Sequence, residues 1–184
     1  MTTQRSTYWL VIAFVIGSFS VAFPDHFPAS KLALGNPEHV LGGVDVYSDK
    51  IASVIARLGK PAKTDSTTSP DYPRGSGERS YEWRSEGVRL RVGTEYRTDQ
   101  QTGRVIESAP MVVDVWGSGG GRLAKTGRGL ALGDQIATAK SAYGSRYERD
   151  SHSITFQWKD ETTLVMDLDD SGRVVHMQLL AATE

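Results

Sequence analysis

Two short stretches of the chain place their hydrophobic residues at helical spacing. In Ile51–Leu58 the apolar residues fall at positions i, i+3, i+4 and i+7, and Gly59 follows directly. This spacing forms one apolar stripe on a helix, and glycine commonly ends a helix in a left-handed conformation. A second stretch, Asp134–Gly144, has a similar layout. The pattern predicts two short helices that end at these glycines and are capped at their starts by Ser48 or Asp49 and by Asp134.

After each predicted helix, apolar and polar residues alternate, as in strands with one buried face. In 88–92, the three apolar residues point one way and Arg89 and Arg91 point the other. Polar turns before Gly103 and Gly172 predict hairpins at those points. The same pattern predicts further strands at 80–84, 103–106, 111–116, 154–158, 163–168 and after Gly172.

The order of these elements occurs twice along the chain. Each predicted helix is followed by a strand that bears a tryptophan, Trp83 or Trp158, and a second strand begins five residues later. This predicts an α+β fold of two tandem repeats, each a helix plus a three-stranded antiparallel sheet, with the helices on one face. The predicted divisions are a signal peptide at 1–22, an extended lead-in at 23–40, repeat 1 at 41–116, a glycine-rich linker at 117–128 and repeat 2 at 129–184.

The alternation also predicts which side chains lie on the sheet face opposite the helices. Arginine and tryptophan are favoured where proteins bind one another, so this face is a candidate recognition surface. The other interpretation is a solvated face that only keeps the sheet soluble. The candidate partner-binding residues are Arg89, Arg91, Asp114, Trp116, Gln157, His176 and Gln178.

The amino terminus has the pattern of an export signal. Arg5 is the only charged residue before an uncharged run, Tyr8–Phe23, and small residues at 20 and 22 suit cleavage before Phe23. The run is shorter than the roughly 20 residues that a membrane-spanning helix needs. The sequence therefore predicts a secreted or periplasmic protein, with membrane attachment only if this segment remains uncleaved.

Composition and motifs exclude several kinds of chemistry. The chain has 21 basic and 22 acidic residues, a formal charge of −1, and no cysteine. This balance argues against nucleic-acid binding through phosphate neutralisation, and the lack of cysteine removes disulfides and thiolate chemistry. The four histidines show no metal-binding spacing, and Asp167–Gly172 fits a hairpin turn better than a calcium loop. We expect no cofactor, no metal and no catalytic activity.

The second predicted helix carries a pattern that resembles a known family. It opens near Gly129-Leu-Ala-Leu-Gly133-Asp134, closes at Tyr143-Gly144 and precedes the strand that bears Trp158. This layout resembles the tandem-repeat fold of β-lactamase inhibitor protein and the single unit of the small outer-membrane assembly lipoproteins. The resemblance implies a continuous, curved antiparallel sheet whose open face grips a partner protein. The chain departs from both families because it has no cysteine for disulfides or for a lipid anchor.

Two functions are consistent with these observations. The first is an exported, non-catalytic module for protein binding or envelope assembly that uses the open sheet face. The alternative is an enzyme or small-ligand carrier with a cleft between the repeats. A deep pocket lined by His152 and Asp134 would favour the alternative, whereas a broad face bearing Arg89, Arg91 and Trp116 would favour the binding module.

Overall fold

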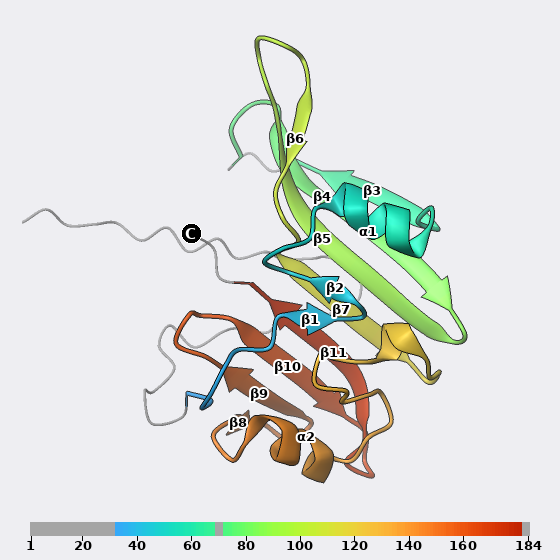
Figure 1. The fold of residues 1–184 in the computed structure, drawn as a ribbon, viewed down its shortest axis with the longest axis vertical. Coiled ribbons are helices and arrows are strands. Elements are labelled where there is room, and N and C mark those ends of the chain that lie inside the picture. Colours follow the sequence, from blue (N-terminus) through green and yellow to red (C-terminus); the bar gives the residue numbers. More distant parts are fainter. Residues whose placement is uncertain (1–31, 69–71, 182–184) are drawn as a thin grey trace, which may run out of the picture.

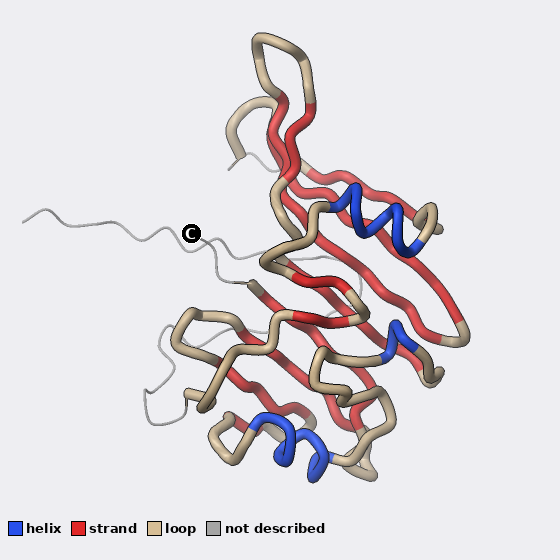
Figure 2. The backbone as a smooth tube through the Cα atoms, viewed as in Figure 1, coloured by secondary structure: helices blue, strands red, loops and turns tan. Residues whose placement is uncertain are grey.

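The computed structural model describes residues 32–68 and 72–181. It is 44% strand and 13% helix, and nine of its strands form one large antiparallel sheet. The predicted α+β fold of two helix-plus-three-strand repeats is therefore wrong, because the protein is mostly β (Figure 2). The predicted signal peptide at 1–22 lies outside the described residues.

Nine strands form the large sheet, β1 and β2 form a separate hairpin, and two α-helices and one 3-10 helix complete the described fold. The large sheet has the order β3-β4-β5-β7-β11-β10-β9-β8, with β6 pairing to β5 beside this path. In chain order the elements are β1 (Val40–Leu41), β2 (Val44–Asp45), α1 (Ile51–Leu58), β3 (Lys63–Thr67), β4 (Ser76–Ser85), β5 (Val88–Thr98), β6 (Val105–Glu107), β7 (Val112–Gly117), the 3-10 helix η2 (Arg122–Ala124), α2 (Ile136–Tyr143), β8 (Glu148–Arg149), β9 (Ser153–Gln157), β10 (Thr163–Leu168) and β11 (Val174–Leu180).

The pairing of β7 with β11 explains why two separate units do not form. Their ladder runs from Trp116 opposite His176 to Val112 opposite Leu180, and it joins the earlier strands to the later ones. Without it, both strands would leave a row of backbone N–H and C=O groups unpaired. Alternation along a strand predicts which face a residue occupies, but it does not predict which strand lies alongside. The hairpin between β10 and β11, predicted around Gly172, is confirmed.

The two α-helices end where the sequence predicts but begin differently. Gly59 and Gly144 follow the last helical residues at φ of 83° and 89°, in the left-handed region. The predicted caps are wrong, because neither helix has a side-chain cap. The carboxylate of Asp49 instead accepts the Asp45 N–H at 2.9 Å, and that of Asp134 accepts the Ala131 N–H at 2.9 Å. Each aspartate therefore fixes the loop before its helix.

The core lies between one face of the sheet and the elements that cover it. Both α-helices and the β1–β2 hairpin lie over the same face (Figure 1). Sheet residues such as Leu90, Met177 and Phe156 are fully buried there, as are Val54 of α1 and Tyr143 of α2. Burying a large apolar side chain stabilises a fold by about 1.5–3 kcal/mol, so this face supplies most of the stability.

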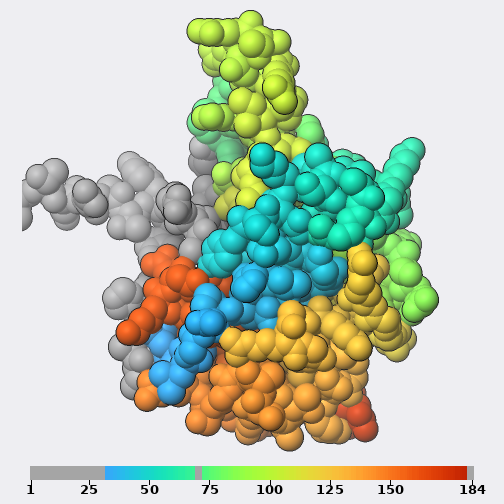
Figure 3. Space-filling view, in the orientation of Figure 1, coloured from blue at the N-terminus to red at the C-terminus, as the bar shows by residue number. Residues whose placement is uncertain are grey.

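The segment before α1 forms a strap across this core. Ala33, Leu41, Val44 and Val46 are buried, and the backbone N–H of Ala33 donates to the Gln157 carbonyl at 2.7 Å. Figure 3 shows the strap in blue, between the helix α1 region and the segment around α2. From residue 33 onward, the predicted extended lead-in is thus part of the packed domain.

A buried carboxylate fixes the strap to α2. Glu38 is only 3% exposed and accepts a hydrogen bond from the Tyr143 hydroxyl at 2.8 Å. It also accepts the backbone N–H groups of His39 and Val40 at 3.0 Å. The Arg128 guanidinium lies 4.9 Å from the centre of the Tyr143 ring. Since an unpaired buried charge is costly, these donors explain how Glu38 is tolerated inside.

Candidate functional site

The face of the sheet opposite the helices, here called the outer face, carries most of the predicted site residues. Pairing of β5, β7 and β11 aligns Arg89, Trp116 and His176 in one row across the strands. The neighbouring row, two residues along each strand, contains Arg91, Asp114 and Gln178. Directly opposite residues on adjacent strands point to the same face, so six predicted residues form one surface.

Gln157 is the one predicted residue that lies apart from this group. It is on β9 and pairs with Thr163 of β10, so a whole strand separates it from β11. Thr163 in turn pairs with Leu180, which places Gln157 in a third row. The alternation of side chains along the strand predicted the face on which Gln157 lies, but it could not predict how far Gln157 lies from the other six residues.

The first row is held together by aromatic contacts. The Arg89 guanidinium carbon lies 5.3 Å from the Trp116 ring centre, within the range of a cation–π interaction. On its other side, the Trp116 ring meets the His176 ring edge-on, with centres 6.1 Å apart and planes at 86°. Trp116 therefore has a cationic group on either side of its indole. Such contacts hold a half-buried aromatic side chain in one orientation.

The pKa of His176 is strongly perturbed by its neighbours on the outer face. Its Nδ1 lies 2.8 Å from an Asp167 carboxylate oxygen, and its Nε2 lies 3.4 Å from one of Asp114. Burial lowers the pKa of the ring, but hydrogen bonds and charge interactions with both aspartates outweigh it and raise this pKa to about 9. The imidazolium form, which has a donor on each nitrogen, matches two acceptors. His176 is therefore charged at neutral pH.

Further polar groups complete the two rows. The Gln178 side-chain amide donates to Asp114 at 2.8 Å, so Asp114 has two side-chain partners. At the β4 side of the surface, the Glu82 carboxylate lies 2.6 Å from Arg84 Nε and 3.7 Å from Arg89 Nε. Two arginines thus share one carboxylate, which leaves this end of the first row positively charged.

Three charged residues that pair, strand to strand, with members of the two rows were not among the predicted site residues, namely Glu82, Arg84 and Asp167. Arg84 is opposite Arg89 and Glu82 is opposite Arg91, so strand parity on β4 would have found both once the hairpin register was known. Asp167 lies opposite His176, next to an irregularity in the β10–β11 register. That irregularity is not visible in the sequence. Counting residues outward from the turn at Gly172 would therefore not show that Asp167 lies opposite His176.

The polar groups of the outer face are spread along the two rows. Within residues 32–68 and 72–181, no group of three or more His, Cys, Asp or Glu side chains is placed so that it could hold a metal ion. The ion pairs and ring contacts form a broad patch of fixed charges and one indole. Such a patch can present donors, acceptors and an aromatic surface to another macromolecule.

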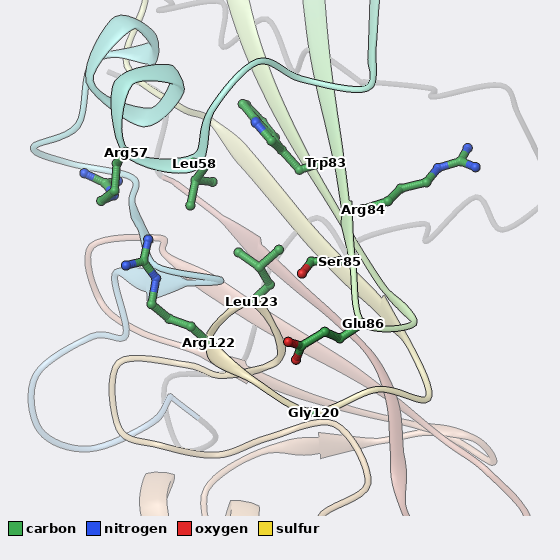
Figure 4. A pocket seen from close by; sticks show the side chains of 9 residues that line it. All are labelled: Arg57, Leu58, Trp83, Arg84, Ser85, Glu86, Gly120, Arg122 and Leu123. Carbon is green, nitrogen blue, oxygen red and sulfur yellow. The ribbon is translucent and has the colours of Figure 1, made fainter.

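A cavity of about 440 Å³ lies elsewhere, between the end of α1, the β4–β5 turn and η2 (Figure 4). His152 and Asp134, named above as markers of a cleft, do not line it. His152 contacts the neighbouring Ser151 hydroxyl at 3.0 Å, and Asp134 is bonded to the loop before α2. The two residues therefore do not form a shared pocket.

Comparisons with protein-family models, curated proteins and solved structures found no match to this chain. Among the residues that the structure describes, no helix has the length and apolar character needed to span a bilayer.

Proposed function

We propose that this chain is an exported, non-catalytic binding module whose outer face holds another protein. The observation that carries the proposal is the row formed by Arg89, Trp116 and His176, because an indole flanked by two cations lies on a sheet face that no described helix covers. Tryptophan and arginine contribute the largest energies at many protein interfaces. A side chain already held in place loses little conformational entropy on binding.

The charges indicate what kind of surface the partner presents. Arg84 and Arg89 share the single carboxylate of Glu82, whereas the charged His176 ring already lies between two carboxylates, those of Asp114 and Asp167. An acidic side chain on the partner would approach the arginines without displacing an existing pair. Complementary charge of this kind increases the association rate and fixes orientation. The partner is therefore expected to present an acidic segment to the β4–β5 side of the outer face.

Site-specific photo-crosslinking in the cells that make the protein tests this proposal. A benzophenone amino acid replaces Arg84 on the outer face or, as the matched control, Ser53 on the exposed side of α1. We expect a discrete protein adduct from position 84 and none from position 53. Adding Trp116→Ala or Arg89→Glu to the position-84 variant should remove the adduct.

Two results would contradict the proposal. Equal adducts from positions 84 and 53 would show unspecific contact. An adduct at position 84 that survives both Trp116→Ala and Arg89→Glu would place the contact outside the row. Export is tested separately by sequencing the amino terminus of the purified protein, which should begin at or near Phe23.

A further inference from the structure

The cavity beside α1 is a second site, distinct from the row on the outer face. Three segments meet there: the end of α1 with Arg57 and Leu58, the end of β4 and the turn after it with Trp83 and Glu86, and the segment of Gly120, Arg122 and Leu123. Its volume of about 440 Å³ falls within the range of pockets that bind small molecules. Its lining is mainly polar, with a smaller apolar part from Leu58, Trp83 and Leu123 (Figure 4). The charged side chains in the lining are Arg57, Arg84, Glu86 and Arg122.

The walls of the cavity are held in place by the fold. The Trp83 indole N–H donates to the Gly59 carbonyl at 2.9 Å, which ties this side chain to the end of α1. A Cβ at Gly119 would lie 1.7 Å from the Glu86 carbonyl oxygen, so only glycine permits this contact with the β4–β5 turn. The glycine-rich segment expected to be a flexible linker is thus packed against a hairpin. A cavity with fixed walls binds at a lower entropic cost.

Two arginines lie on one wall, and they differ in whether another residue neutralises their charge. Arg57 donates to the Asp49 carboxylate at 2.5 Å and to the Gly43 carbonyl at 2.9 Å. Arg122 makes no hydrogen bond or ion pair with any residue in the described ranges. Figure 4 shows both guanidinium groups on the same side of the cavity. Since Asp49 already balances Arg57, the unbalanced positive charge belongs to Arg122.

The opposite charge is supplied by Glu86. Within the described part of the chain, no basic side chain forms an ion pair with its carboxylate. Arg122, on the same cavity, is also too far away to pair with it. Glu86 has φ of 51°, in the left-handed region that glycine, asparagine or aspartate occupies more readily in such a turn. Residues kept in this conformation are often found at functional sites. Figure 4 shows its carboxylate closer to Leu123 than to Leu58, which lies at the end of α1.

We propose that this cavity binds a small zwitterion with an apolar side chain, either an amino acid or a short peptide. Its carboxylate pairs with Arg122, its ammonium group pairs with Glu86, and its apolar part packs on Leu58, Leu123 and the Trp83 ring. This arrangement uses two charges that have no ion-pair partner among the described residues, together with the apolar side chains of the lining. Charge-assisted hydrogen bonds at both ends would give the site its selectivity. Of the outer-face residues used above, Arg84 also lines this cavity, whereas Arg89, Trp116 and His176 do not.

Calorimetric titration of the full-length protein with L-leucine and with L-leucyl-L-leucine tests the proposal, and the two probes separate an amino acid from a peptide as the ligand. We expect saturable binding of at least one. Arg122→Gln and Glu86→Gln should each weaken it by about tenfold or more, the effect of losing one charge-assisted hydrogen bond. Arg104→Gln, a matched arginine in the exposed turn before β6, should leave it unchanged.

Modified probes assign each charge to its partner. Leucinamide lacks the carboxylate, so its weaker binding should be insensitive to Arg122→Gln. N-acetyl-leucine lacks the ammonium group, so its binding should not fall further with Glu86→Gln. The shift of the Trp83 indole signal in ¹H–¹⁵N spectra locates the ligand in the cavity. The proposal is overturned if neither zwitterion binds at millimolar concentration, or if both variants bind as tightly as the original chain.

Discussion

The two faces of the sheet are built from the same strands but serve different ends. On β5, Val88, Leu90 and Val92 point into the core, whereas Arg89 and Arg91, which alternate with them, point to the outer face. On the covered face, contacts are apolar and close-packed. On the outer face, they are ion pairs, hydrogen bonds and ring contacts around Trp116.

This difference separates stability from recognition within a single strand. Removing a buried apolar side chain loses transfer free energy and leaves a cavity. Removing a half-exposed charged side chain costs little, because water solvates what remains. Variants of neighbouring residues should therefore change two different properties, and the following experiments test that separation.

The largest effect is expected from Phe156→Ala on the covered face. Phe156 is fully buried and contacts the rings of Tyr143, Tyr147 and Trp158. The variant should lose about 3–5 kcal/mol of unfolding free energy, measured by urea denaturation. Its neighbour Thr155 lies on the outer face, and Thr155→Ala should change stability by less than about 0.5 kcal/mol. Comparable losses from the two variants would refute the division between faces.

His176 is the exception that sharpens the comparison, because it should stabilise the fold from the outer face. Its pKa rises from 6.5 to about 9 on folding, so the stabilisation is complete below about pH 6.5 and disappears as pH rises through 9. Discounted for the 29% exposure of the side chain, it is about 1–3 kcal/mol. Unfolding free energies of His176→Gln and the original chain should differ by this amount at pH 6 and converge above pH 9. A gap independent of pH would contradict it.

Two tryptophans on the covered face provide a smaller, matched test. The Trp83 indole N–H donates to Gly59 at 2.9 Å, whereas the buried Trp158 N–H has no partner in the described structure. Trp→Phe removes a satisfied donor at the first position and an unsatisfied one at the second. Trp83→Phe should therefore cost about 1–2 kcal/mol more than Trp158→Phe in thermal or urea unfolding. The reverse order would show that a further group pairs with Trp158.

The smallest effect on stability is expected at the centre of the outer face. A cation–π contact at a partly exposed site contributes about 0.5–1 kcal/mol. A double-mutant cycle of Arg89→Ala and Trp116→Ala should give a coupling of this size, while both variants lose the photo-crosslinked adduct. A coupling above about 2 kcal/mol would mean that the row is a structural element and not a surface held ready for a partner.

The sequence allowed some features to be predicted because they depend on local pattern. The helix ends at Gly59 and Gly144 and the hairpin at Gly172 follow from residues within a few positions. The lateral pairing of β7 with β11 joins segments far apart in the chain, so the sequence pattern could not show it. The polar strand β3, Lys63–Thr67, carries no alternation and was missed for that reason.

The candidate site was predicted to a similar extent. The alternation of side chains predicted that Arg89, Trp116 and His176 lie on one face. Their contact depends on the register in which β5, β7 and β11 pair, which the alternation does not give. The role of Asp167 depends on a register irregularity, and the cavity at Glu86 depends on a close approach between Gly119 and a distant turn. Contacts of this kind arise from tertiary structure and leave no periodic signal.

The central place of β11 has a consequence for how the protein is made. It is the last described strand in chain order, yet it lies between β7 and β10 in the middle of the sheet. While a ribosome is still adding these residues, β7 and β10 each present an open edge with nothing to close it. A polypeptide cut short before Val174 would keep both edges and should precipitate, so we expect the chain to become soluble only once β11 has been made.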